Sequence, residues 1–193
     1  GNTVLSAEQN NEQMIYPRET GSLASCLQVI NSMDGELIHN IDFENNETLF
    51  NLASVTFKTT GLTYLVISTA VDFSFTTKSL SPRFYLKCYK ILQDLKLELM
   101  HQTKVEKPVA SVVDFAGKLL VGMGNTLRLY DMGQKQLLRK AEITLNNLNN
   151  IISLKTQGFR IYVGDIKESI TFVVYKPKQN IFIPFVDDFV SRH

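Results

Sequence analysis

A short glycine-containing segment has the pattern nearest to a cofactor-binding loop. Gly122-Met123-Gly124-Asn125 reproduces half of the G-x-G-x-x-G loop that binds dinucleotides. That loop needs a third glycine and a following helix, whereas here the chain continues to Asp131 as a strand-like run. We therefore expect a tight hairpin turn at this position and no cofactor.

The titratable residues form no catalytic or metal-binding pattern. His39, His101 and His193 are scattered, without a cysteine or carboxylate at ligand spacing. Asp187 and Asp188 are adjacent, so on a strand they would point to opposite faces rather than act as a pair. No serine has a G-x-S-x-G context. We expect surface or edge-strand histidines, no catalytic residue and no metal site.

Four cations lie near one expected hairpin: Arg128, Lys135, Arg139 and Lys140. They could be a solvated strand edge, which is the usual role of exposed charges. They could also form an interaction patch that contacts RNA phosphates or an acidic partner. The sequence leaves both readings open.

Composition indicates an ordinary soluble globular protein. Apolar residues make up 44% and charged residues 20% of the 193 residues, and the formal charge of +1 lacks the basic excess of a nucleic-acid-binding domain. No apolar run approaches the roughly 18 residues of a membrane span. Cys26 and Cys88 are expected to be reduced, buried thiols of a cytosolic or nuclear protein. Because the chain starts at Gly1 without a methionine, we expect it to begin within a longer polypeptide.

Short apolar stretches, separated by turn residues, recur about every 8–12 residues from residue 25 onward, which predicts an all-β fold. The expected strands lie near 25–30, 36–43, 50–57, 63–70, 83–91, 96–104, 109–115, 118–123, 125–131, 136–143, 150–156, 159–165, 168–175 and 180–187. A segment within 143–150 is the one serious helix candidate. Residues 1–21 are polar and are expected to form a flexible arm or loop.

The strands form a repeat. Ser54, Ser111 and Ser153 occupy matching places in three units, and three tyrosines would mark the third strand of each. The spacing, roughly 40 to 45 residues in the later units, is the period of a WD40-like blade. The first unit is longer, which predicts an insertion at about 71–82.

This pattern predicts blades at about 50–104, 109–143 and 150–187, preceded by a half blade at 25–43. Residues 22–193 would therefore supply about three and a half blades of one incomplete β-propeller. Closed propellers usually have four to eight blades, so the missing blades would come from elsewhere in a longer chain. A single β-sandwich is the structural alternative.

Several segments resemble one known family. The stretch Gly117 to Glu142 is the longest of them, and Ser25–Asn31, Glu44–Glu47 and Gln157–Asp165 match as well. They resemble the large triple-propeller proteins, a family that comprises the third subunit of splicing factor 3b, the large cleavage-and-polyadenylation subunit and the large damaged-DNA-binding subunit. The resemblance covers nearly all of residues 22–193.

Within this family the splicing branch fits best, on Leu129–Glu142, Glu168-Ser169 and Phe185–Asp188 followed by Arg192. One departure is His193, where the family commonly has tryptophan, and it suggests a divergent fungal member.

The resemblance implies a nuclear, non-catalytic scaffold of the splicing factor 3b complex in the U2 small nuclear ribonucleoprotein. The implied partners are the other subunits of that complex, especially its HEAT-repeat subunit, in a setting of U2 RNA and pre-messenger RNA. The resemblance implies no cofactor, no membrane and no small-molecule substrate. The alternative is a propeller adaptor of a ubiquitin ligase or of the 3′-end cleavage and polyadenylation complex.

Overall fold

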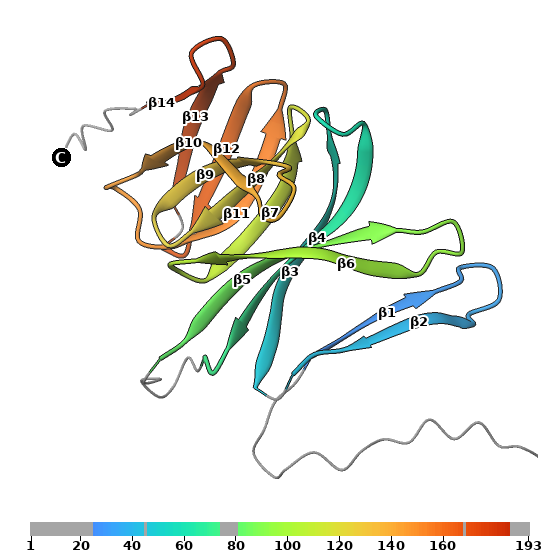
Figure 1. Cartoon of the computed structure of the whole chain (residues 1–193). Helices are drawn as coiled ribbons and strands as arrows, with labels where there is room; N and C mark the ends of the chain where they lie inside the picture. The colour runs from blue at the N-terminus through green and yellow to red at the C-terminus, as the bar shows by residue number, and fades with distance from the viewer. Residues whose placement is uncertain (1–24, 45, 74–80, 168, 186–193) are drawn as a thin grey trace, which may run out of the picture.

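The structure, a computed structural model, describes residues 25–44, 46–73, 81–167 and 169–185. Within these ranges the chain forms fourteen strands and no helix (Figure 1). No helix there could span a membrane. The strands are β1 Cys26–Ile30, β2 Leu37–Asp42, β3 Glu47–Phe57, β4 Leu62–Val71, β5 Arg83–Ile91, β6 Leu97–Val105, β7 Val109–Phe115, β8 Lys118–Met123, β9 Thr126–Asp131, β10 Leu138–Thr144, β11 Ile151–Gln157, β12 Arg160–Asp165, β13 Ile170–Lys176 and β14 Ile181–Phe185.

The strands form three four-stranded antiparallel sheets and one two-stranded sheet. The three sheets, β3–β6, β7–β10 and β11–β14, each run in chain order from one edge to the other, and β1 pairs with β2. We call the three sheets the first, second and third blade. The all-β class with propeller-type blades, predicted from the sequence, is confirmed. How the rest of a propeller is supplied stays a prediction.

The blades stack face to face through two apolar cores. Leu119 and Leu120 follow each other in β8, so their side chains point to opposite faces of the second blade. Leu119 belongs to the core shared with the first blade, together with Phe57. Leu120 belongs to the core shared with the third blade, together with Ile161. A blade covered on both faces has strands that are buried throughout, as β9 is.

The edges of the stack follow the same order. At one edge lie the first strands of the three blades, where β7 contacts β3 on one side and β11 on the other. β10 and β14, the last strands of two blades, are in contact at the other edge. Each first hairpin turns at a glycine with positive φ, namely Gly61 at 66°, Gly117 at 75° and Gly158 at 58°. These turns also join neighbouring blades, since the Lys58 N–H donates to the Gly117 carbonyl (3.0 Å).

The predicted helix within 143–150 is wrong. The chain turns there, with the Leu148 N–H donating to the Leu145 carbonyl (3.0 Å). The N–H groups of Asn149 and Asn150 donate to Asp165 Oδ1 at 3.1 and 2.7 Å. A side-chain acceptor that captures backbone donors competes with helix formation, and here it wins.

The expectation of two buried thiols is half wrong. Cys26 is exposed, because it lies on the outer face of the hairpin β1–β2, and Cys88 is buried in the first core. Both cysteines are free thiols. Burial raises the pKa of Cys88 to about 12. The predicted arm at 1–21 lies outside the described residues, as do Asp187, Asp188 and His193.

Candidate interaction surfaces

The third blade has one covered and one open face among the described residues. Ile161 and Val173, which are fully or almost fully buried, point toward the second blade. On the open face, Ile170, Phe172 and Phe185 are 66%, 43% and 56% exposed. Large apolar side chains gathered on one sheet face mark a surface that is normally covered by a partner.

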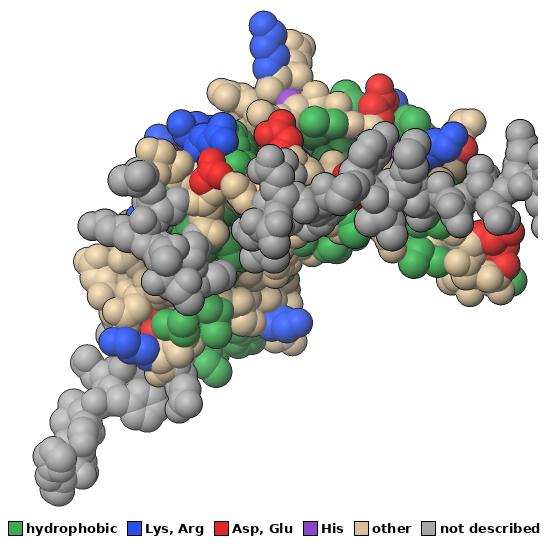
Figure 2. Space-filling view, turned by 90° about the horizontal axis from the view of Figure 1, so that it is seen from below, with side chains coloured by type: hydrophobic (Ala, Val, Ile, Leu, Met, Phe, Trp, Pro, Cys, Tyr) green, Lys and Arg blue, Asp and Glu red, His purple; other side chains and the backbone are tan. Residues whose placement is uncertain are grey.

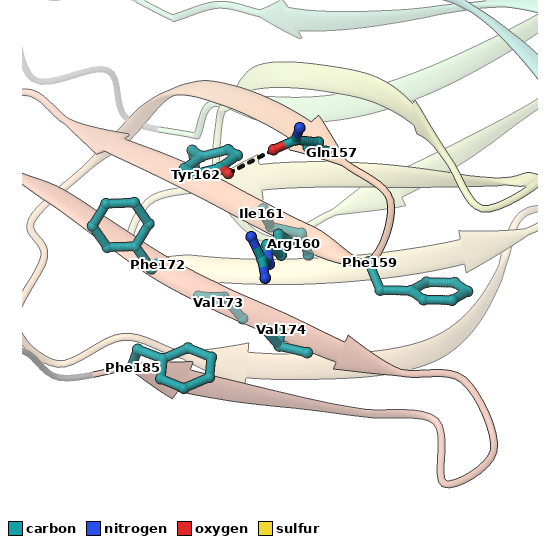
Figure 3. A pocket seen from close by; sticks show the side chains of 9 residues that line it. All are labelled: Gln157, Phe159, Arg160, Ile161, Tyr162, Phe172, Val173, Val174 and Phe185. Atoms are coloured by element: carbon teal, nitrogen blue, oxygen red, sulfur yellow. Dashed lines mark hydrogen bonds between the residues drawn. The ribbon is translucent and has the colours of Figure 1, made fainter.

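The open face is shallowly hollowed rather than flat. Figure 3 shows Tyr162, Phe172 and Phe185 on neighbouring strands. These side chains line a depression of about 740 Å³. The rings of Tyr162 and Phe172 meet edge to face, with centroids 5.4 Å apart. Tyr162 Oη donates to Gln157 Oε1 (3.1 Å). Among the described residues that line the depression, Arg160 and Tyr162 are the only ionisable ones. The side chains that line the depression are suited to apolar and aromatic contacts with a partner and do not form a catalytic group.

The first blade is partly covered by the hairpin β1–β2 at the other end of the stack. Phe43, directly after β2, packs with Ile67 and Tyr89 of the first blade. Closer to the inner edge of the same blade Leu52 remains 48% exposed. The hairpin thus covers the outer part of this face and leaves the inner part open.

Polar contacts fix the hairpin to the first blade. The Leu97 N–H donates to His39 Nδ1 (3.0 Å), and Lys87 Nζ lies 2.6 Å from Glu47 Oε1, which is 1% exposed. The same ammonium lies 5.0 Å from the centre of the Phe43 ring. The cation joins a buried carboxylate of the first blade to an aromatic ring that directly follows β2, so the hairpin β1–β2 is a fixed part of the stack.

The four predicted cations separate into two environments. Arg128 is 7% exposed and donates to Glu106 Oε2 (2.8 Å), to Tyr130 Oη (2.9 Å) and to Glu142. Partial burial alone would raise the pKa of Glu106, but the hydrogen bond from Arg128, a backbone hydrogen bond and the nearby positive charges together hold that pKa below its usual value. Arg128 is therefore an internal brace between the β6–β7 connection and the outer strands of the second blade.

The other three cations, Lys135, Arg139 and Lys140, are exposed. Arg139 Nη1 lies 3.5 Å from Glu142, an acid already bound by Arg128, and its side chain remains 60% exposed. Whether these three residues bind a partner stays a prediction.

The residues weighed for catalysis have structural positions. Gly124 has φ 54° in the β8–β9 hairpin, and Lys107 Nζ donates to the Asn125 side chain (3.2 Å), as expected for a turn. His101 lies between the first and second blades with Nε2 3.1 Å from Met132 Sδ, and burial lowers its pKa. Among the described residues no three histidine, cysteine or acidic side chains meet as metal ligands would.

Two buried aspartates, which the sequence did not single out, organise the loops. Asp165 ends β12 and accepts the Asn149, Asn150 and Lys167 N–H groups. Asp131 ends β9 and accepts the Thr59 hydroxyl of the first blade at 2.8 Å. Their place in the sequence could have identified them, because each aspartate is the last residue of a strand that is otherwise mostly apolar.

Comparison with known proteins places the chain. Residues 24–193 match the family described as "CPSF A subunit region". The chain belongs to this family. The CPSF A match covers all the described strands, and the family predicted from Gly117–Glu142 and its companion segments is thereby confirmed.

Relatives within this family have splicing names. The chain is 43% identical over 94% of its length to "Pre-mRNA-splicing factor rse1" of Emericella nidulans. It is 36% identical over 89% of its length to "Probable splicing factor 3B subunit 3" of Dictyostelium discoideum, and 37% over 95% to "Spliceosome-associated protein 130 A" of Arabidopsis thaliana. It spans 14% to 15% of the length of these curated relatives.

Proposed function

We propose that this chain is part of a propeller in a non-catalytic scaffold subunit of a splicing factor 3b complex. The observation that carries this is the match of 94% of the chain, at 43% identity, to a pre-mRNA-splicing factor. Relatives from a slime mould and a plant also have splicing names, so the likeness is not confined to fungi. In that role the subunit supports spliceosome assembly and branch-site recognition in the U2 small nuclear ribonucleoprotein.

The geometry suits a scaffold. Stacked blades with fully buried cores hold many loops at fixed positions, and loops are where binding residues gather. Three buried polar side chains, those of Arg128, Asp131 and Asp165, hold loops and strands together. Such a body presents surfaces rather than a reactive centre.

The apolar faces that are open at the two ends of the stack would be covered if the stack were part of a larger propeller. The relatives are more than six times longer than the segment matched here, since that segment is 15% of their length. Further blades from such a polypeptide would cover Phe172 and Phe185 at one end and Leu52 at the other. Residues 25–43 would then be the outer half of a complete blade.

The partners that follow from this function are the other subunits of the complex, above all its α-helical HEAT-repeat subunit. A ribonucleoprotein with U2 RNA and pre-messenger RNA would be the setting, in the nucleus. The near-neutral charge of +1 favours protein contacts over direct contacts with RNA.

Affinity purification of the tagged, complete protein from nuclear extract tests this proposal. Recovery of splicing factor 3b subunits and U2 RNA is the expected result. Recovery of a cullin, or of polyadenylation factors, without splicing subunits would overturn it in favour of an adaptor or 3′-end-processing role. A tagged propeller protein of unrelated function provides the control for non-specific capture.

A further inference from the structure

Two hairpin turns of neighbouring blades lie together at one end of the stack. They are residues 132–137, between β9 and β10, and residues 177–180, between β13 and β14. In a four-stranded meander the third turn always falls at the same end as the first, so these turns share an end with Gly117 and Gly158. β10 and β14, the strands that follow the two turns, are in contact.

Asn180 fixes one turn against the neighbouring blade. Its Nδ2 donates to the Lys140 carbonyl (3.1 Å), and its Oδ1 accepts the Tyr175 hydroxyl. The residue has φ 58°, a left-handed conformation that asparagine tolerates better than most side chains. The two turns therefore belong to one surface that crosses the joint between the second and third blades.

The exposed charges that the described residues place on this surface are mostly positive. Its exposed cations are Lys135, Arg139, Lys140, Lys176 and Lys178. The nearby described acids carry little free negative charge: Glu142 binds Arg128 and lies 3.5 Å from Arg139, and Asp131 is 4% exposed and accepts the Thr59 hydroxyl. The view from below, in contrast, shows acidic and basic side chains interspersed with apolar ones (Figure 2).

We infer that these five cations form one docking surface for an acidic segment of a protein partner. The inference rests on the scaffold function proposed above and deepens it by naming a surface and the chemistry of its partner. It includes two residues, Lys176 and Lys178, that lie about 40 residues from the cations grouped by sequence. The surface excludes Arg128, because its guanidinium is buried and already bound to Glu106 and Tyr130.

An acidic peptide fits this surface better than RNA does. Four of the five cations are lysines, which act as point charges, whereas planar, two-pronged phosphate recognition favours arginine. Neither turn itself contains an aromatic residue on which an unpaired base could stack. A bulge at Lys140 interrupts the regular alternation of side chains along β10. As a result, the neighbouring cations Arg139 and Lys140 are both exposed.

The test uses the complete protein and two labelled probes of equal charge, a poly-L-glutamate peptide and an oligouridine RNA. Two double variants reverse the charge on each blade separately, Arg139→Glu with Lys140→Glu and Lys176→Glu with Lys178→Glu. A matched control, Lys104→Glu with Lys167→Glu, reverses two exposed lysines elsewhere on the stack. Anisotropy titrations give the affinities, and melting curves verify that each variant is folded.

Each blade's double variant is expected to weaken peptide binding by about tenfold or more, while the control changes it by less than about twofold. Equal losses in all three variants would overturn the inference, as would tighter binding of the RNA than of the peptide. In the nuclear purification, loss of one protein subunit from the combined variant supports the surface. Full recovery of every subunit with that variant refutes the surface but leaves the proposed function standing.

Discussion

Replacing Arg128 with methionine tests whether this buried arginine is a brace. The change removes a cation that binds Glu106, Glu142 and Tyr130 while keeping a side chain of similar length. Removing one partner of a fully buried ion pair costs about 3–5 kcal/mol. Here Glu106 is 68% exposed and Glu142 34%, so both carboxylates can return to water. We therefore expect a loss of about 2 kcal/mol.

The loss should be local, since a protein of several propellers does not unfold in one step. Amide hydrogen exchange of peptides from β9 and β10 measures the free energy of opening at the site itself. The matched control is Arg139→Met, which removes a 60% exposed cation 3.5 Å from the same Glu142 and should change that free energy by less than about 0.5 kcal/mol. Equal effects of the two substitutions would refute the brace.

The same brace predicts a pH dependence. The pKa of Glu106 is below its usual value of 4.5, so its ionised form is favoured in the folded protein. Its contribution is fully present above pH 4.5 and is lost as the pH falls through the lowered pKa of the folded state. The protection of β9 and β10 in Arg128→Met should therefore fall less between neutral pH and pH 3 than in the unaltered protein. A parallel fall in both proteins would contradict the pairing.

Three further outcomes are expected. The 193-residue segment alone should aggregate, because the open face of the third blade lacks a partner, and a soluble monomer with cooperative melting would contradict this. Gly117→Ala should destabilise the first hairpin of the second blade by about 1–2 kcal/mol, since a Cβ at φ 75° would lie 2.2 Å from the Lys58 side chain. Gly35→Ala, at φ 79° but with open space, is its control and should cost less in the same exchange measurement. A thiol reagent should label Cys26 at once and Cys88 only after unfolding, and mass spectrometry of the labelled peptides would reveal the reverse order.

The repeat could be predicted from the sequence because period-two alternation and turn residues are local signals. Tyr89, Tyr130 and Tyr175 do lie on the third strand of each blade, β5, β9 and β13. All three tyrosines are buried, because each side chain points into an apolar core between two sheets. The strand ends were less predictable: β3 begins at Glu47 because its first residues pair with the long β4 beyond the apolar run.

The ion pair between Arg128 and Glu142 could not be predicted in the same way, because it depends on strand register. Glu142 lies opposite Arg128 only because a bulge at Lys140 shifts the pairing of β9 with β10 by one residue. No residue in the segment signals that bulge, so the sequence placed Arg128 among exposed cations. The contact between Asn180 and Lys140 is a second example, since it joins blades whose relative position no local pattern encodes.

Both the ion pair of Arg128 and the contact of Asn180 depend on how the strands pack, and packing also decides which charges reach the surface. The formal charge of +1 is the sum over all charged side chains of the sequence. Folding pairs some of these charges with one another and leaves others exposed. Glu106 and Glu142 are used by Arg128. Within the part of the chain that the structure describes, the cations of the two turns have no comparable set of exposed acids beside them, so an almost neutral chain can present a locally positive surface. The exposure and arrangement of individual charges, and not their total, therefore decide whether such a blade can bind an acidic partner.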